Sequence, residues 1–346
     1  MLPIAIDVMS GDHEPREYLA GALRALADDA ELRVLLVGEP GLIAAALAGL
    51  PQAVRERAAV IPATQVVAMD EKPREAIRRK KDSSMRLAVD QVHEGRASAC
   101  VSAGNTGALT AIAHFVLKTL PGVERAAIIS AIPAAHGLTH MLDLGANTKA
   151  TPEQLRQFAA MGSIVARDVY GVAEPRIGLL NIGEEDIKGN EVVKQAAELL
   201  KSSGLNFHGN VEGTDIYRGT TDVIVCDGFV GNVALKTSEG LAQMLADYLR
   251  EEFTRTAWRR LLAVFALPML NSFKRRVDPR RYNGATLIGL RGVVIKSHGG
   301  ADALAFRYAL KKAHAEVANG VLERIAQRLS VTPGPVTVAP AGSGNA

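Results

Sequence analysis

The sequence predicts an α/β fold in which helices cover a layered, mostly parallel sheet. Short apolar runs rich in Val and Ile alternate with helical patterns along nearly the whole chain. Glycine turns follow several of these runs; at 222–240, for example, the apolar run 223–226 leads through Asp227 and Gly228 into a helical pattern. The 346 residues are 48% hydrophobic and 22% charged, so the chain can bury a large core.

The elements are placed in order by these patterns. Strands are expected over 4–8, 32–37, 59–61, 97–102, 127–131, 140–144, 176–181, 205–211, 223–226 and, as a pair, within 287–296. A first helix is expected from the end of the loop 9–15 to residue 26. Others are expected over 42–50, around the basic run 78–81, and from the end of 83–85 to residue 92. The remaining helices are expected over 108–117, 151–170, 190–201, 231–267 and 303–329. Thr151, Pro152 and Gln154 have the spacing of a capping box with Pro in the first turn.

The domain organisation follows from this alternation. Residues 1–330 are expected to form one catalytic unit of two interlocked subdomains, with a helical hairpin at about 240–281. The tail 331–346, rich in Pro, Gly, Ser and Ala, is expected to be disordered.

Composition narrows the class of protein. Cys100 and Cys226 lie in apolar strand-like runs, which indicates buried reduced thiols and a cytoplasmic protein. The N-terminus reaches Asp7 too early for a signal peptide, and no apolar run is long enough to span a membrane. Aromatic residues are only 4% of the chain, which argues against nucleic-acid binding by base stacking.

The motifs of several enzyme classes are absent. The chain has no GxGxxG, no GxxxxGK[ST], no HExxH and no CxxC, so no nucleotide cofactor and no metal is expected. No serine or cysteine has the setting of a covalent nucleophile. This absence suggests direct transfer onto a bound group.

Four glycine turns are expected to meet at one rim of the sheet, where ligands bind in open α/β folds. They lie at 102–107, 143–147, 181–190 and 227–232. Taken by itself, Lys188 is best interpreted as a solvated loop lysine. Beside the other glycine turns, a lysine that binds an anion is an equally good interpretation. Asn105, Asn147, Asn190 and Asn232 are each explained as helix caps, yet together they suggest a ligand site. His298, alone more often structural, repeats the strand–glycine–helix setting.

A basic, apolar segment stands out at 250–281, where nine Lys or Arg accompany three Asp or Glu. One interpretation is a buried amphipathic helix with basic edges. We favour a hairpin that lies on an anionic membrane or docks an acidic protein. The residues expected to make this contact are Arg255, Trp258, Arg259, Arg260, Phe265, Lys274, Arg275 and Arg276. The basic run at 78–81 is interpreted as a solvated helix face.

Taken in order, the motifs resemble one family. They are AIDVMSGD at 5–12, SAGNTG at 102–107, DLGAN at 143–147, NIGEE at 181–185, KGN at 188–190, GNVEG at 209–213, DGFVGN at 227–232 and the segment 289–302. The chain resembles the bacterial phosphate acyltransferases of phospholipid synthesis from residue 4 to about 329. Ser10 stands where that family more often has Gly.

The resemblance implies a fold similar to isocitrate and isopropylmalate dehydrogenases and to phosphate acetyltransferase. It implies transfer of a long-chain acyl group from acyl carrier protein to inorganic phosphate, giving acyl phosphate, by a homodimer attached peripherally to the membrane. Phosphate is already an anionic nucleophile, so positioning and charge compensation matter more than a general base.

The site roles are then assigned as follows. Lys188 and the helix start at Gly231 and Asn232 would hold phosphate. An amide of Asn105, Asn147 or Asn232 would bind the thioester oxyanion, oriented by Asp143 and Asp227. Further substrate contacts are expected from Gly104, Gly107, Gly183, Asn190, Gly228, Gly231 and His298.

Two other functions remain open at this stage. A dehydrogenase of the related fold would require a nicotinamide site and metal-binding aspartates. A non-enzymatic scaffold for membrane or carrier protein would explain the basic segment but not the glycine turns.

Overall fold

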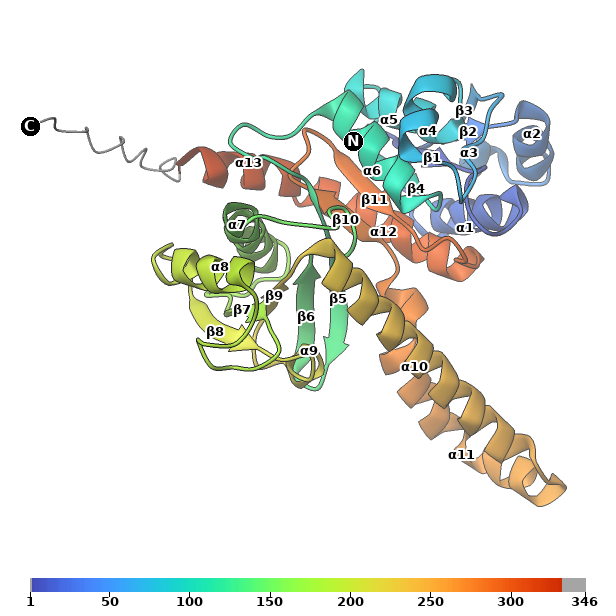
Figure 1. Ribbon diagram of the computed structural model, residues 1–346. Coiled ribbons are helices and arrows are strands. Elements are labelled where there is room, and N and C mark those ends of the chain that lie inside the picture. The colour runs from blue at the N-terminus through green and yellow to red at the C-terminus, as the bar shows by residue number, and fades with distance from the viewer. Residues whose placement is uncertain (1, 332–346) are drawn as a thin grey trace, which may run out of the picture.

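A single mixed sheet of eleven strands runs through the described part of the molecule (Figure 1). The structure is a computed structural model that describes residues 2–331, apart from the side chains at 261, 270–277, 330 and 331. The strand order is β3-β2-β1-β4-β11-β10-β5-β6-β9-β7-β8. Of the expected tail 331–346, Val331 is the last residue of a helix, and 332–346 lie outside the described residues.

The strands are mostly parallel, but they run in two opposite directions. They are β1 (Ile4–Asp7), β2 (Val34–Gly38), β3 (Ala58–Pro62), β4 (Ala99–Ser102), β5 (Ala127–Ala134), β6 (Gly137–Leu142), β7 (Ile177–Leu180), β8 (Phe207–Val211), β9 (Val223–Val225), β10 (Ala285–Ile288) and β11 (Val293–Lys296). β10 is antiparallel to both neighbours, and β5 is antiparallel to β6. The carboxyl ends of β1, β4 and β11 therefore lie at the edge opposite to those of β6, β9 and β7.

Helices cover both faces of the sheet. They are α1 (Pro15–Asp28), α2 (Pro40–Ala48), α3 (Gln52–Arg55), α4 (Pro73–Arg79), α5 (Ser84–His93), α6 (Thr106–Leu117), α7 (Pro152–Asp168), α8 (Glu191–Lys201), α9 (Asp215–Arg218), α10 (Gly228–Thr254), α11 (Ala257–Val277), the 3-10 helix η1 (Pro279–Tyr282), α12 (Ala303–Ala318) and α13 (Val321–Val331). α5, α6 and the start of α10 pack on one face, while α1 and α12, and further along α7 and α8, pack on the other. The expected capping box of Thr151 and Gln154 is confirmed.

Three sequence expectations needed correction. The expected strand 140–144 ends at Leu142, because Asp143 turns away from the sheet. The expected helix 303–329 is two helices, since Gly320 takes a positive φ of 60° between them. The expected helix 231–267 is two helices, since the chain reverses near 255–256 and the second helix, α11, continues past Pro268. α10 and α11 lie side by side and extend away from the rest of the molecule (Figure 1).

Both cysteines are buried free thiols, as expected, and burial raises the pKa of each. The packing around Cys226 also bears on the site, since its Sγ lies 3.6 Å from the carbonyl oxygen of Asp143.

A buried histidine in β6 makes stability depend on pH. His140 is 2% exposed, its Nδ1 lies 3.2 Å from the carbonyl oxygen of Asp222, and its Nε2 has no partner. Burial, with nearby Lys312 adding to it and Asp222 opposing it, lowers the pKa of His140 from 6.5 to about 4. The unfolded chain therefore binds this proton first as pH falls, so the contribution is complete above about pH 6.5 and declines towards pH 4.

We expect His140→Phe to reduce this dependence. Between pH 7 and pH 5 the wild-type free energy of unfolding should fall by roughly 2 kcal/mol more than that of the variant. Urea unfolding at the two pH values measures the difference. His208→Phe, at an exposed histidine, is the control and should retain the wild-type slope. Equal slopes for wild type and His140→Phe would contradict the assignment.

Candidate active site

The turn after β6 is built around one buried carboxylate. The Asp143 side chain accepts hydrogen bonds from the backbone N–H groups of Ile128 (3.0 Å), Gly145 (3.1 Å), Ala146 (2.9 Å) and Asn147 (2.7 Å). Burial raises the pKa of Asp143, although these donors oppose the shift. Asp143 thus fixes the shape of the 143–147 turn, which is a positioning role.

The start of α10 is pressed against this turn. Gly228 N–H donates to the carbonyl oxygen of Asn147 at 2.8 Å, and the Asp227 carboxylate caps the helix by accepting from Val230 N–H at 2.9 Å. Gly231 N–H donates to the Asp227 carbonyl at 2.9 Å. These amides are already paired and a carboxylate stands beside them, so the expected phosphate site on the backbone of this helix start is not supported.

The four asparagines differ in what they have left to offer. Asn105 uses its amide hydrogens on the carbonyls of Met69 (2.6 Å) and Glu71 (3.2 Å). Asn147 uses its own on the Ala126 carbonyl (2.8 Å) and Asp143 (2.9 Å). Both are therefore structural, and neither can bind an oxyanion without breaking these bonds.

Asn190 and Asn232 remain. Asn190 caps α8 by accepting from Val193 N–H at 3.0 Å. Asn232 is exposed and its side chain has no partner within the described residues. It lies beside the 143–147 turn, since a Cβ placed on Gly145 would be 3.6 Å from its Oδ1. Of the three amides expected at the oxyanion, Asn232 alone has unpaired donors within the described residues, and the amide hydrogens of the capping Asn190 are unpaired there as well.

Lys188 lies in the loop that follows β7, next to β9 in the sheet. Asn181 supports the loop by donating from Nδ2 to the Lys188 carbonyl at 3.2 Å. The Lys188 side chain is exposed, and its ammonium group has no partner in the described part of the chain. A Cβ on Gly183 would approach Lys188 Cγ to 3.0 Å, so Gly183 makes room for this side chain rather than touching a ligand. The loop leaves the same sheet edge as the 143–147 and 227–232 turns.

The fourth glycine turn, 102–107, is at the opposite edge, so the expectation of one common rim is wrong. β10 is antiparallel to both β11 and β5, so β5 still runs parallel to β4, and the antiparallel pairing of β5 with β6 causes this separation. At this edge the buried Asp7 accepts from Ser102 Oγ at 2.6 Å. Gly104 and Gly107 serve close packing, since added Cβ atoms would lie 2.6 Å from Ser10 Cβ and 3.2 Å from Pro73 Cγ respectively.

The two halves meet where α10 passes the loop after β11. Lys236 Nζ lies 2.9 Å from His298 Nε2 and 2.8 Å from Glu239 Oε2, which is 3.6 Å from the same imidazole nitrogen. His298 Nδ1 accepts from Gly300 N–H at 3.0 Å, which assigns the ring hydrogen to Nε2. The Lys236 ammonium and the Nε2–H group are therefore both donors, and Glu239 Oε2 is the acceptor that they share. Burial favours the neutral form of Glu239, but hydrogen bonds from His298 and Lys236 outweigh it and lower its pKa.

A second lysine lies beneath this junction. Lys296 ends β11, is 8% exposed, and donates from Nζ to the carbonyls of Ala103 and Ser297. Burial, with Lys236 adding to it, lowers the pKa of Lys296 to about 8, and the acids Asp12, Asp7 and Glu239 limit the shift. The sequence motifs did not predict Lys296, Lys236 or Glu239 as site residues. A lysine that closes an apolar strand just before a glycine loop was the available signal.

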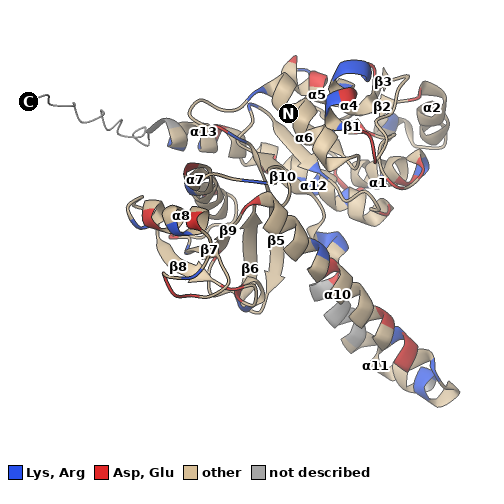
Figure 2. Ribbon diagram, viewed as in Figure 1, with Lys and Arg blue, Asp and Glu red and all other residues tan. Residues whose placement is uncertain are grey.

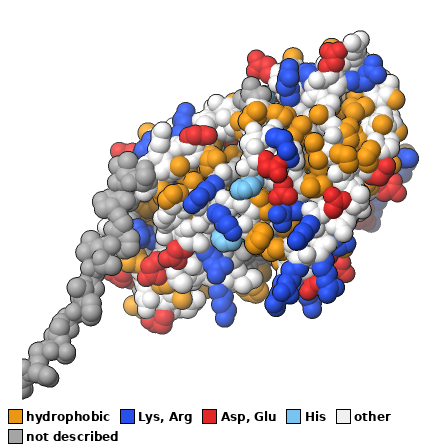
Figure 3. Space-filling view, turned by 90° about the horizontal axis from the view of Figure 1, so that it is seen from above, with side chains coloured by type: hydrophobic (Ala, Val, Ile, Leu, Met, Phe, Trp, Pro, Cys, Tyr) orange, Lys and Arg blue, Asp and Glu red, His pale blue; other side chains and the backbone are white. Residues whose placement is uncertain are grey.

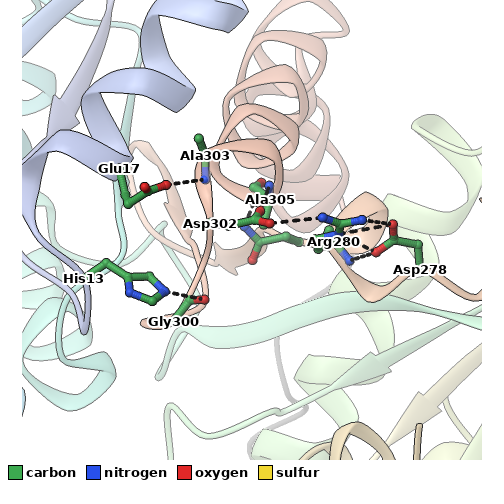
Figure 4. Close-up of polar contacts among 9 residues, drawn as sticks. His13, Glu17, Asp278, Arg280, Gly300, Asp302, Ala303 and Ala305 are labelled. Carbon is green, nitrogen blue, oxygen red and sulfur yellow. Dashed lines mark hydrogen bonds and ion pairs between the residues drawn. The ribbon is translucent and has the colours of Figure 1, made fainter. Parts of the chain in front are cut away.

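The loop that carries His298 is held from three sides (Figure 4). His13 Nε2 lies 3.2 Å from the Gly300 carbonyl, and Glu17 accepts from Ala303 N–H at 3.3 Å. Arg280 binds Asp302 at 3.0 Å and also pairs with Asp278. These contacts join α1, η1 and α12, so the imidazole is presented from a fixed loop.

The hairpin residues are largely exposed. Trp258 is 66% and Phe265 76% exposed, whereas Arg255 and Arg259 both pair with Glu252. Arg260 donates to the Thr254 carbonyl at 2.9 Å. The side chains of Lys274, Arg275 and Arg276 lie outside the described residues. No helix in the described chain is both long and apolar enough to cross a bilayer.

This architecture is shared with acyl- and phosphate-handling enzymes. A phosphotransacetylase from Streptococcus pyogenes aligns over 93% of this chain and 94% of its own, with a TM-score of 0.59 and 17% identity. A branched-chain phosphotransacylase from Enterococcus faecalis aligns over 91% and 99%, with a TM-score of 0.54 and 14% identity. A 4-hydroxythreonine-4-phosphate dehydrogenase from Klebsiella pneumoniae aligns over 92% and 100%, with a TM-score of 0.53 and 13% identity. At these identities the likeness establishes the fold, and the dehydrogenase-like α/β fold expected from the sequence is confirmed.

The family follows from a separate comparison. The model of the family described as fatty acid synthesis protein matches residues 2–324, and the chain belongs to that family. The family resemblance drawn from the ordered motifs is thereby confirmed.

Proposed function

We propose that the protein transfers a long-chain fatty acyl group from an acyl carrier protein thioester to inorganic phosphate, giving acyl phosphate for phospholipid synthesis. Membership of the fatty acid synthesis protein family supports the substrate class. The shared fold of the phosphotransacetylase and the branched-chain phosphotransacylase supports the reaction type. The observation that carries the proposal is the contact between Lys236 and His298, which joins the two halves close to charged Lys296 and Glu239.

The proposed reaction requires compensation of the phosphate charge and transfer of a proton to the leaving thiolate. A phosphate oxygen attacks the thioester carbonyl carbon, the C–S bond breaks, and the proton lost by hydrogen phosphate ends on the carrier thiol. Lys188 and Lys236 compensate the phosphate charge, and the free Asn232 amide donates to the carbonyl oxygen as it becomes an oxyanion. The proton of hydrogen phosphate passes to the leaving sulfur, and His298 stabilises the thiolate as it forms by donating a hydrogen bond from Nε2 while keeping its own proton.

Release of carrier thiol tests this function. Purified protein with acyl carrier protein thioester should release thiol at a rate that depends on added phosphate, and hydroxylamine should trap the acyl phosphate formed. Thiol release that is independent of phosphate would indicate a hydrolase instead. Tight binding of NAD or NADP would favour a dehydrogenase of the same fold.

We also propose that the α10–α11 hairpin contacts an anionic membrane surface. Trp258, Phe265 and Met269 are exposed along α11 and would enter the interface between headgroups and acyl chains. Phe265→Glu is expected to weaken co-sedimentation with vesicles containing phosphatidylglycerol by about tenfold, since it places a charge in that apolar contact. Leu2→Glu, at an exposed apolar residue outside the hairpin, is the control. Unchanged sedimentation of Phe265→Glu would contradict the membrane role.

A further inference from the structure

A basic pocket lies on the outer surface of the N-terminal half. It has a volume of about 680 Å³ and is lined by Arg74, Ile77, Arg78, Lys81, Arg86 and Phe115, from α4, α5, α6 and the α4–α5 loop. Figure 2 shows Lys and Arg concentrated on α4. Seen from above, basic side chains gather beside exposed apolar ones (Figure 3). Residues 72–81 hold six Lys or Arg against one acid, Glu75.

Three of the four cations that line this pocket are unpaired in the described chain, whereas the fourth, Arg86, pairs with Asp90 at 2.8 Å. Arg74, Arg78 and Lys81 have no hydrogen-bond or ion-pair partner within the described chain. Their neighbours are paired: Arg79 with Glu75 at 2.9 Å and Lys80 with Glu71 at 3.9 Å. Three unpaired cations around one concave surface repel each other, and an anionic partner would relieve this repulsion.

The pocket also has an aromatic anchor. Phe115 is 50% exposed, and its ring centroid lies 5.6 Å from the Arg86 guanidinium and 4.9 Å from Lys118 Nζ. Arginine beside an exposed aromatic ring is the combination enriched at protein–protein hot spots, whereas a site for a small anion would enclose its ligand. These features favour an acidic protein surface as the occupant.

The pocket is connected to the 102–107 turn, in which the Ala103 carbonyl accepts a hydrogen bond from Lys296 Nζ. Asn105 caps α6 and holds the carbonyls of Met69 and Glu71, just before α4. Pro73 at the start of α4 packs against Gly107. From this end of α6 to Phe115 the helix axis measures about 14 Å, at 1.5 Å for each residue. A partner seated at the pocket would lie one short helix away from the 102–107 turn.

We propose that this pocket docks the acidic face of the acyl carrier protein, an inference that rests on the proposed function and names the surface used by its protein substrate. The hairpin is the weaker candidate because Arg255 and Arg259 already share Glu252, while Arg74, Arg78 and Lys81 of the pocket have no partner within the described chain. Charge complementarity of this kind accelerates encounter and sets orientation, so its loss should appear with the whole carrier protein and not with a small thioester.

Charge reversal at adjacent positions of α4 tests the docking surface. Arg78→Glu is expected to lower kcat/KM for acyl carrier protein thioester at least tenfold at low salt and to leave that for an acyl pantetheine thioester within twofold. Arg79→Glu is the matched control, since Arg79 lies next in sequence but does not line the pocket. Lys81→Glu, outside α4, guards against a folding defect of the first variant, and thermal unfolding of all three checks that they are folded.

Three outcomes of these kinetic measurements would overturn the proposal. Equal losses with both thioesters would place the pocket in the chemistry, and losses restored by raised phosphate would make it an inorganic phosphate site. A loss for Arg259→Glu on α11, with none for Arg78→Glu, would assign docking to the hairpin. Calorimetric titration with the carrier protein alone separates the two hypotheses: if wild type binds it and Arg78→Glu does not, docking stands even if no phosphate-dependent turnover is found.

Discussion

Gly231→Ala is expected to abolish most of the transfer activity and to destabilise the fold. A Cβ at this position would overlap the backbone carbonyl oxygen of Asp143 and lie 2.9 Å from Cys226 Sγ. Neither neighbour can yield easily, because the Asp143 backbone belongs to the turn that its own carboxylate fixes. α10 must shift instead, carrying Asn232 and Lys236 with it. We expect a loss of about 3 kcal/mol in the free energy of unfolding and of about 100-fold in rate.

Gly240→Ala is the matched control on the same helix. Nothing lies within 4 Å of a Cβ at that position, so the alanine should be tolerated and stabilise the helix by roughly 0.5–1 kcal/mol. Urea unfolding and phosphate-dependent thiol release of the two variants measure the contrast. Wild-type stability and rate for Gly231→Ala would show that the contact between α10 and the 143–147 turn does not matter.

The glycine at 231 also shows what sequence reasoning could and could not reach. The turn after the apolar run 223–226, the helix that follows it and the layered α/β fold were all predicted, since they depend on local pattern. The purpose of the glycine was not predicted. It permits close packing against a carbonyl 88 positions earlier in the chain, and no local pattern reports such a contact.

The direction of the strands was the main limit. Glycine turns follow β4, β6, β7 and β9, and a wholly parallel sheet would have gathered them at one edge. The antiparallel pairing of β5 with β6 reverses the direction, which leaves three turns at one edge and 102–107 at the other. An apolar run has the same pattern in a parallel and in an antiparallel strand, so the direction of a strand is decided by its tertiary pairing and not by its own sequence.

A second limit on prediction was that the sequence does not show which amide groups are already hydrogen-bonded. Four asparagines were equivalent candidates by type and position, yet Asn105 and Asn147 use their amide hydrogens on backbone carbonyls and, in one bond of Asn147, on the Asp143 carboxylate. Such carbonyls come from segments 21 to 36 residues away, so the sequence does not reveal which amide is free. The same holds for Lys236 and His298, which meet across 62 positions.

Lys236→Met is expected to raise the KM for phosphate by about 10- to 100-fold, with a smaller change in the KM for the thioester. The substitution keeps the length of the side chain but removes the ammonium group that lies between His298 and Glu239, and a hydrogen bond to a charged group is worth about 1.5–3 kcal/mol. The uncompensated Glu239 carboxylate would then face the incoming phosphate, which adds repulsion. Lys236→Arg keeps the charge and should recover part of the affinity.

Lys194→Met is the control for Lys236→Met, since Lys194 forms the same kind of pair with a glutamate three residues away, Glu191, but on the exposed surface of α8. Steady-state kinetics with varied phosphate gives the KM of each variant, and Lys188→Met in the same series measures the contribution of the other lysine assigned to phosphate. If Lys188→Met raises the KM while Lys236→Met does not, phosphate is held at the loop after β7 alone. The contact between α10 and His298 would then join the two halves of the protein without touching the substrate.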